Sequence, residues 1–249
     1  SPLSEVESDL AEASRYYKNV PRIFFTGANP FVLTTDKLKI LAQMVKKYYP
    51  NYETIGCFGR VTDVYNKSVD DLKELRKLGY DGITFGVETG NDEALAFMNK
   101  GFRSSDTIEQ MKKLEEAGIS YNFFYLTGIS GAGHGEYGAK KTAEVFNQLH
   151  PQIIESSMLT IYKTSELYQE IQKGTWKEES EIEKLAELKA LIENLTIKTR
   201  IVTDGASNLI QVRGNLPHDK KKLTDYLARL IATADESALR EYRVHLKHL

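Results

Sequence analysis

Residues Gly82 to Gly90, Gly-Ile-Thr-Phe-Gly-Val-Glu-Thr-Gly, indicate the fold class of this chain. Ile83, Phe85 and Val87 form a short apolar run bounded by glycines, which predicts a strand buried on both faces. Such strands occur in parallel sheets that are covered by helices on either side. Glu88 and Thr89 stand at the downstream end of the strand, where ligands bind in parallel α/β folds. Alternatively, Glu88 caps the next helix or pairs with a lysine.

Strands recur along the chain, each followed by a helical pattern. The predicted strands start near residues 22, 53, 82, 119 and 152, so successive starts lie about 30 residues apart. That spacing is the length of one strand–helix unit in a barrel or a doubly wound sheet. A helix predicted over residues 4–19 has no strand ahead of it, so we expect a strand upstream of Ser1.

The composition changes at Lys177. Residues 178–194 predict a highly charged helix with one apolar stripe, and we expect its charged side to be a solvated outer face. The predicted domains are a barrel over 1–176 and a mostly helical extension over 177–249 that packs on it. Beyond the charged helix, the sequence predicts a short strand (199–203), a loop (214–219) and closing helices (220–249).

The overall composition is that of an ordinary globular protein. The 249 residues are 41% hydrophobic, and the formal charge of −2 leaves no net basic field that would indicate nucleic acid. A single cysteine, Cys57, excludes an internal disulfide framework and suits a reducing compartment. The sequence has no secretory signal and no apolar run long enough to cross a bilayer. We therefore expect a cytoplasmic protein with no membrane partner.

Two loops at predicted strand ends can approach a ligand closely. In the first, Gly27 and Ala28 carry almost no side chain. Asn29 follows as a partner for a ligand amine, and Pro30 holds the turn, although an ordinary strand-to-helix turn would look the same. The second loop, residues 126–133, is glycine-rich but lacks the P-loop ending and the dinucleotide fingerprint. Bare backbone that faces an adenosine or a substrate is the better interpretation.

Charged residues stand at the same strand ends. Three cations, Arg60, Lys100 and Arg103, can bind a carboxylate. With Glu88 as the partner of an ammonium group, this rim suits an amino acid zwitterion. Paired surface charges without a function would look the same.

The remaining polar residues indicate little chemistry. Tyr125 and Tyr162 lie near strand ends and are candidate substrate contacts. The histidines form no metal-ligand set, and no Ser-His-Asp or Cys-His arrangement can be assembled. Cys57 is expected to be a small buried apolar group. No metal ligand is therefore predicted in this chain.

Several short segments follow one another in a distinctive order. They are Phe24-Phe-Thr-Gly-Ala-Asn-Pro, Lys67-Ser ahead of Leu78-Gly, Gly86-Val-Glu-Thr-Gly, Asn99-Lys-Gly, Glu116-Ala-Gly-Ile, Met158-Leu-Thr-Ile-Tyr, Glu166-Leu-Tyr and Gly214-Asn-Leu-Pro-His-Asp. This ordered set resembles the radical SAM superfamily, in particular its Fe–S oxidoreductase branch. The resemblance covers nearly the whole chain and is far more specific than any single segment.

The resemblance implies a fold and an activity. The fold is a partial (βα)6 TIM-like barrel with its first strand missing, plus C-terminal helices. S-adenosylmethionine would bind at the strand ends beside a 4Fe–4S cluster, which passes one electron to the sulfonium. The adenosyl radical then abstracts hydrogen from a substrate, a small molecule or another class that the sequence does not indicate. The electron donor would be a protein such as a flavodoxin or a ferredoxin.

The resemblance also implies cofactor contacts residue by residue. Gly27 to Pro30 match the family's Gly-Gly-Glu motif, which holds the methionyl amine, although Ala28 and Asn29 replace its second glycine and its acid. The other implied contacts are Glu88 and Thr89 to the ribose or amine, Lys100 or Arg103 to the carboxylate, and Gly128, Leu159 and Thr160 beside the adenine.

One departure from the family is large. The family holds its cluster through a Cys-x3-Cys-x2-Cys triad, whereas this chain has only Cys57. We therefore expect a fragment without the cluster segment or, less favoured, a degenerate binding or scaffold domain. An unrelated barrel hydrolase or lyase, with Glu88 and either Asp63 or Arg60 as acid–base groups, is a third alternative. A missing first strand would also leave an open edge, at which two chains can pair as a dimer.

Overall fold

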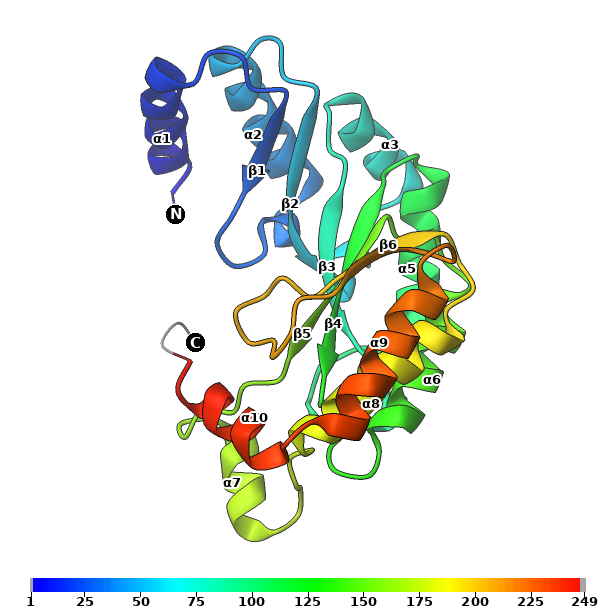
Figure 1. The fold of residues 1–249 in the computed structure, drawn as a ribbon. Helices are drawn as coiled ribbons and strands as arrows, with labels where there is room; N and C mark the ends of the chain where they lie inside the picture. The colour runs from blue at the N-terminus through cyan, green and yellow to red at the C-terminus, as the bar shows by residue number, and fades with distance from the viewer. Residues whose placement is uncertain (1, 247–249) are drawn as a thin grey trace. The chain divides into compact units, whose positions relative to one another are not determined.

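The protein is a mixed α/β fold, described for residues 2–246 in a computed structural model (Figure 1). The sheet has seven strands in these residues, ordered β1 to β7 as in the chain. The pairs β1–β2, β2–β3, β4–β5 and β5–β6 are parallel, and β6–β7 is antiparallel. The predicted α/β class with a mainly parallel sheet is confirmed. The strands are β1 (Arg22–Phe25), β2 (Thr54–Arg60), β3 (Ile83–Glu88), β4 (Tyr121–Thr127), β5 (Ile153–Met158), β6 (Thr199–Val202) and β7 (Arg213–Leu216).

Helices alternate with the strands, as the sequence predicted. The helix predicted over 4–19 corresponds to α1, which ends a few residues earlier, and helices follow the predicted strands as expected. The α-helices are α1 (Leu3–Tyr16), α2 (Thr35–Tyr48), α3 (Val69–Lys77), α4 (Asp92–Phe97), α5 (Ser104–Glu116), α6 (Gly135–Phe146), α7 (Glu166–Lys173), α8 (Glu181–Asn194), α9 (Lys220–Thr233) and α10 (Glu236–Val244). Two short 3-10 helices, η1 (Pro30–Val32) and η2 (Val61–Val64), follow β1 and β2.

The chain forms two compact units. Unit 1 consists of residues 1–86 and 109–122, and unit 2 consists of residues 87–108 and 123–249. The predicted domain boundary at residue 177 stays a prediction, as does the strand expected ahead of Ser1. Within the described part of the chain, no helix is both long and apolar enough to span a membrane. The cytoplasmic location is likewise still a prediction.

Unit 1 is built around the first strands. β1 pairs with β2 in a register that begins with Arg22 opposite Thr54, and β2 pairs in turn with β3. Ile55 and Phe85, on β2 and β3, have no exposed surface. The Phe85 ring meets the ring of Phe31 edge-on, with centroids 5.8 Å apart. This aromatic pair links the strand to the segment that follows β1.

Unit 2 combines the later strands with a layer of helices. α8 packs against both α6 and α9 (Figure 1). The apolar stripe predicted for α8 is buried, with Leu185, Leu188 and Leu191 at most 1% exposed. The start of α8 is a capping box, in which Ser180 and Glu183 exchange hydrogen bonds with each other's backbone amides.

Three features of unit 2 depart from the sequence predictions. The loop expected over 214–219 contains most of β7, whose four residues are too few for a strand pattern, and α7 was not predicted. The expected solvated face of α8 was wrong, because Glu181, Lys184 and Glu187 have no exposed surface. Glu181 and Lys184 pair with each other, Glu178 also pairs with Lys184, and Arg240 and Arg243 also pair with Glu181. The last residues of the predicted closing helices, 247–249, lie outside the described residues.

Candidate functional site

In unit 1, the loop after β1 presents open backbone. Gly27 has a φ of +99°, and a Cβ added there would meet nothing within 4 Å. The side-chain nitrogen of Asn29 donates to Oδ2 of Asp63 at 2.8 Å, and the Arg60 amide donates to the same oxygen at 2.7 Å. Because a carboxylate only accepts, the Asn29 amide oxygen must face away from Asp63. That oxygen is the acceptor an ammonium group requires.

A buried lysine, Lys67, holds this loop through hydrogen bonds to backbone carbonyl groups. Lys67 is 4% exposed, and its Nζ donates to the carbonyl oxygens of Phe31 at 2.9 Å and Asp63 at 2.8 Å. The same Nζ lies 4.8 Å from the centre of the Phe31 ring. Burial lowers the pKa of Lys67 from its ordinary value. Sequence reasoning missed this role, because a lysine before a helix ordinarily indicates a solvated side chain.

A groove of about 730 Å³ adjoins the same loop in unit 1. Residues of α1, β1 and α2 line it together with the loop from Thr26 to Pro30. Ala28 and Pro30 therefore line this groove. The small side chain of Ala28 and the turn fixed by Pro30 are consistent with that position.

In unit 2, Glu88 has an unusual backbone conformation. Its φ is +68°, in the left-handed region that side-chain-bearing residues rarely adopt. Such strain persists where the surrounding structure requires it and is concentrated at functional sites. Nζ of Lys100 lies 3.7 Å from Oε2 of Glu88, and both side chains are half-buried. The predicted lysine pairing is confirmed, whereas the cap of α4 is Asn91, which accepts from Glu93 at 3.1 Å.

Thr89 and Tyr125 lie beneath the surface of unit 2. Thr89 has no exposed surface, and its Oγ1 lies 3.1 Å from Oγ1 of Thr142 on α6. The hydroxyl of Tyr125, equally buried, donates to Oε1 of Glu187. Both hydroxyls thus hold the unit together. Direct ligand contact by Thr89 or Tyr125 stays a prediction.

Acidic side chains and a carbonyl occupy three backbone amides of the glycine-rich loop. The Gly128 amide donates to Glu187 at 2.6 Å, and the Gly133 amide donates to Glu183 at 3.0 Å. The Ala132 amide donates to the carbonyl of Lys177 at 2.9 Å. A phosphate cradle would require such amides to be free. The sequence-based exclusion of a P-loop agrees with this geometry.

The segment after β5 contains an orphaned hydroxyl. Oγ1 of Thr160 is buried, and within residues 2–246 it has no hydrogen-bond partner. Its neighbour Leu159 is held at both ends, with its amide donating to Thr127 and its carbonyl accepting from Arg243 at 2.7 Å. A buried hydroxyl without a partner is costly unless a ligand or water satisfies it.

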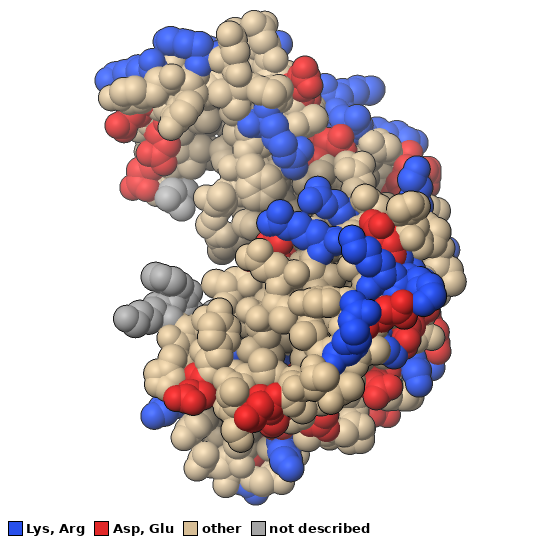
Figure 2. All heavy atoms as spheres, viewed as in Figure 1, with Lys and Arg blue, Asp and Glu red and all other residues tan. Residues whose placement is uncertain are grey.

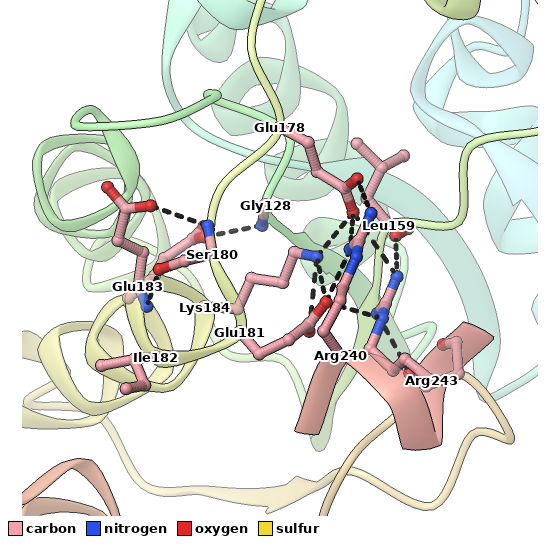
Figure 3. Close-up of polar contacts among 12 residues, drawn as sticks. Gly128, Leu159, Glu178, Ser180, Glu181, Ile182, Glu183, Lys184, Arg240 and Arg243 are labelled. Atoms are coloured by element: carbon pink, nitrogen blue, oxygen red, sulfur yellow. Dashed lines mark hydrogen bonds and ion pairs between the residues drawn. The ribbon is translucent and has the colours of Figure 1, made fainter. Parts of the chain in front are cut away.

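A network of charges ties α10 to α8 and to Leu159 (Figure 3). Lys184 lies 2.8 Å from Glu178 and 3.3 Å from Glu181, and Arg240 lies 2.7 Å from Glu181. Burial alone would raise the pKa of Glu178, but hydrogen bonds from Arg240 and Lys184 outweigh it and lower this pKa to about 2. Arg243 adds a contact of 3.2 Å to Glu181. Sequence reasoning missed this network because its two arginines, Arg240 and Arg243, are far along the chain from the acids that they bind.

Comparison with known proteins identifies the family. A model of the Radical SAM superfamily matches residues 2–137, more than half of the chain. The chain belongs to the radical SAM superfamily. It is also 25% identical over 145 residues to the tRNA uridine(34) acetyltransferase of Methanocaldococcus jannaschii, covering 56% of this chain and 27% of that protein. The chain thus spans about a quarter of the length of this relative.

Solved structures share the radical SAM fold of this chain. An N-terminally deleted Elp3 of Methanocaldococcus infernus matches with a TM-score of 0.63 and 16% identity, over 92% of this chain and 61% of that one. Coproporphyrinogen III oxidase (HemN) from Escherichia coli, described as a radical SAM enzyme, matches with a TM-score of 0.62 and 17% identity, over 77% of this chain and 44% of that one. At these identities the likeness concerns the barrel-like fold alone.

The 4Fe–4S cluster and S-adenosylmethionine are the cofactors of the radical SAM superfamily. The residues of this chain do not fit the cluster. Cys57 is fully buried in β2, where burial raises its pKa to about 12 and keeps it a thiol, whereas cluster ligation requires several thiolates. In the described residues, no group of three His, Cys, Asp or Glu side chains is arranged to hold a metal ion.

S-adenosylmethionine fits better, because the chain retains polar groups suited to it. Within unit 1, these groups are the loop from Gly27 to Pro30 with the Asn29 oxygen, and the exposed Arg60. Within unit 2, taken by itself, they are Glu88 paired with Lys100 and the unpartnered hydroxyl of Thr160. Arg103 and Tyr162 are exposed, and Gly128 packs against Lys184 and Leu159. The individual contacts of these residues with the cofactor stay predictions.

Proposed function

We propose that this chain is the S-adenosylmethionine-binding core of a radical SAM enzyme. The observation that carries the proposal is the strained, ion-paired Glu88 at the end of β3, in a chain that belongs to this superfamily. Bound to its cluster, the family's cofactor supplies a radical that abstracts hydrogen. This chain's residues do not supply the cluster's thiolates, so the proposal concerns how the chain binds and orients S-adenosylmethionine.

The proposed roles follow from charge and hydrogen-bonding capacity. In unit 2, Lys100 pairs with the methionyl carboxylate. In unit 1, considered by itself, the Asn29 oxygen is an acceptor for an ammonium group. Glu88 accepts from the ribose hydroxyls, since its half-buried carboxylate has oxygens to spare beside Lys100. Thr160 offers its unpartnered hydroxyl to the adenine edge. We propose further that a protein such as a flavodoxin or ferredoxin donates the electron. The proposal also includes a dimer formed at β1 and a cytoplasmic location.

Calorimetric titration of S-adenosylmethionine into the full chain tests this function. We expect Glu88→Gln and Lys100→Met each to weaken binding about 10- to 100-fold, because each removes a charge-assisted contact of about 1.5–3 kcal/mol. Lys113→Met, which breaks a pair with the exposed Glu109, is the control and should leave the affinity unchanged. Binding that is equal in wild type and both site variants would contradict the proposal and favour a scaffold domain.

A second candidate function, action on RNA, is favoured by the charge of one edge of unit 2. Residues 196–229 contain seven lysines and arginines against three aspartates, whereas the whole chain has a formal charge of −2. Figure 2 shows Lys and Arg side chains gathered over β6 and α9. Arg200 and Asn215 are opposite each other on the exposed face of the β6–β7 pair. A phosphate backbone binds to such a surface.

The curated relative named above acts on tRNA by its name, which adds support for an RNA substrate. Fluorescence anisotropy with a labelled tRNA, measured over a range of salt concentrations, tests this candidate. We expect Lys198→Glu, Arg200→Glu and Lys222→Glu each to lower the logarithmic salt slope by about 1. Exposed lysines of unit 1 are the controls, and Lys37→Glu or Lys112→Glu should not change the slope. Equal losses in both sets would mean non-specific attraction.

A further inference from the structure

Glu179 is an acid that has no donor. It is 1% exposed, and neither of its carboxyl oxygens has a hydrogen-bond donor among the described residues. Both oxygens lie over Gly135 at the start of α6, where a Cβ would be 2.6 Å from one and 2.8 Å from the other. Only a glycine at that position leaves room for the carboxyl group. An ionised carboxylate in this place would be desolvated without compensation.

Glu187 is the partner that Glu179 faces. The charge of Glu187 acts on Glu179 and helps to raise its pKa, and Glu187 has no exposed surface. Both oxygens of Glu187 already accept, one from the Tyr125 hydroxyl and the other from the Gly128 amide at 2.6 Å. Glu187 therefore accepts through both of its oxygens, whereas burial raises its pKa to about 7. A hydrogen bond between two such acids requires a proton, and the acid without other partners must carry it.

The charges around the pair agree with one retained proton. Three cations, Lys184, Arg240 and Arg243, face Glu178 and Glu181 in the adjoining network. Two carboxylates leave one positive charge unbalanced, and a single ionised member of the Glu179–Glu187 pair neutralises it. The other groups facing the pair are Tyr125 on β4, and Glu183 and Lys184 on α8.

We infer that Glu179 is held as a neutral carboxylic acid that donates its proton to Glu187, and that this shared proton positions the glycine-rich loop after β4. Glu187 fixes the Gly128 amide at one end of that loop, and Glu183 fixes the Gly133 amide at the other. Burial, followed by the charge of Glu187, raises the pKa of Glu179 in support of this assignment. Glu179 is thus a positioning residue, because it acts on the loop through Glu187.

The sign of the pH dependence follows from the retained proton. Above the ordinary pKa of a glutamate, the unfolded chain has released this proton and the folded chain keeps it, so stability falls as pH rises. The loss continues until the folded protein also releases the proton at its raised pKa. One proton changes the unfolding equilibrium constant by up to about tenfold per pH unit.

Isotope-edited infrared spectroscopy of the full chain, with 13C-labelled glutamate, observes the proton directly. At neutral pH we expect a protonated-carboxyl band in wild type that is lost in Glu179→Gln. Glu136→Gln, an exposed acid at the start of α6, should retain the band. If Glu179→Gln leaves the spectrum in this region unchanged, the proposal is overturned.

Urea unfolding from about pH 6 to about pH 9 gives an independent readout. An amide at position 179 still donates to Glu187 but has no proton to lose. The unfolding equilibrium constant of Glu179→Gln should therefore change less steeply with pH than that of wild type, by up to about tenfold per pH unit. Glu187→Gln should be the more harmful variant at neutral pH, because an amide cannot accept from both Tyr125 and Gly128. The reverse order of the two variants would overturn the assignment. Should Glu187→Gln fail to fold, Glu179→Gln alone decides through both measurements.

The consequence for cofactor binding rests on the proposed function, whereas the retained proton does not. We expect Glu179→Gln to bind S-adenosylmethionine as wild type does, because its loop stays in place. If neither protein binds the cofactor but the infrared band behaves as expected, the proposed function fails and this inference stands. If both bind and the band is absent, only this inference fails.

Discussion

Replacement of Lys184 by methionine is expected to lower the free energy of unfolding by about 3–5 kcal/mol. Lys184 has no exposed surface, and its Nζ lies 2.8 Å from Glu178 and 3.3 Å from Glu181. Methionine fills much of the same space but leaves Glu178 and Glu181 with one positive charge fewer. Removal of one partner from a buried ion pair is strongly destabilising, because the remaining charge stays desolvated. Urea denaturation at neutral pH measures the loss.

The same helix provides a matched control. Lys189 on α8 pairs with Glu193 at 2.7 Å, but both side chains retain solvent contact. Lys189→Met should therefore change stability by less than about 1 kcal/mol. A loss in Lys184→Met as small as that in Lys189→Met would mean that water reaches the charge network. The network would then not hold α10 against α8.

The second large effect is expected in unit 1. Phe85→Ala should lower the free energy of unfolding by about 3–5 kcal/mol, the range found for phenylalanines lost from cores. Phe85 has no exposed surface, and its ring supports the ring of Phe31, over which Nζ of Lys67 lies. The resulting cavity should loosen the loop after β1 as well. Chemical denaturation measures the stability, and hydrogen exchange at the Lys67 amide measures the loosening.

Phe97 supplies the comparison for this variant. Its side chain is 46% exposed at the end of α4, so Phe97→Ala removes little buried surface and should cost less than about 1 kcal/mol. Equal losses in Phe85→Ala and Phe97→Ala would show that β3 does not form the core of unit 1. The fold assignment that began with this strand would then be wrong.

Much of the fold was predictable because it depends on local patterns. The alternating strand and helix segments appear in the sequence as apolar runs between glycines and prolines, and β3 spans nearly the stretch predicted. β7 escaped prediction because its residues, Arg213 to Leu216, carry little apolar signal and are a strand only by pairing with β6. The buried face of α8 escaped because a charged helix is ordinarily solvated.

The candidate site was predictable only in part. Glu88 and Lys100 were selected from their places at element ends, and they form an ion pair. The supporting residues Asp63 and Lys67 act on the first loop through contacts that no spacing rule indicates. Nothing in the sequence indicates that the hydroxyl of Thr160 is buried without a hydrogen-bond partner, because that depends on the tertiary structure.

The sequence by itself determined the α/β class, the alternation of strands and helices along the chain and the family, because apolar periodicity and short motifs are local features of the chain. The tertiary structure alone decided the electrostatics. Glu179 and Glu187 are eight positions apart in the sequence, where they resemble ordinary acids on the surface of a helix. Packing removes both from water beside Tyr125 and Lys184, and desolvation together with these neighbours then determines which acid keeps its proton.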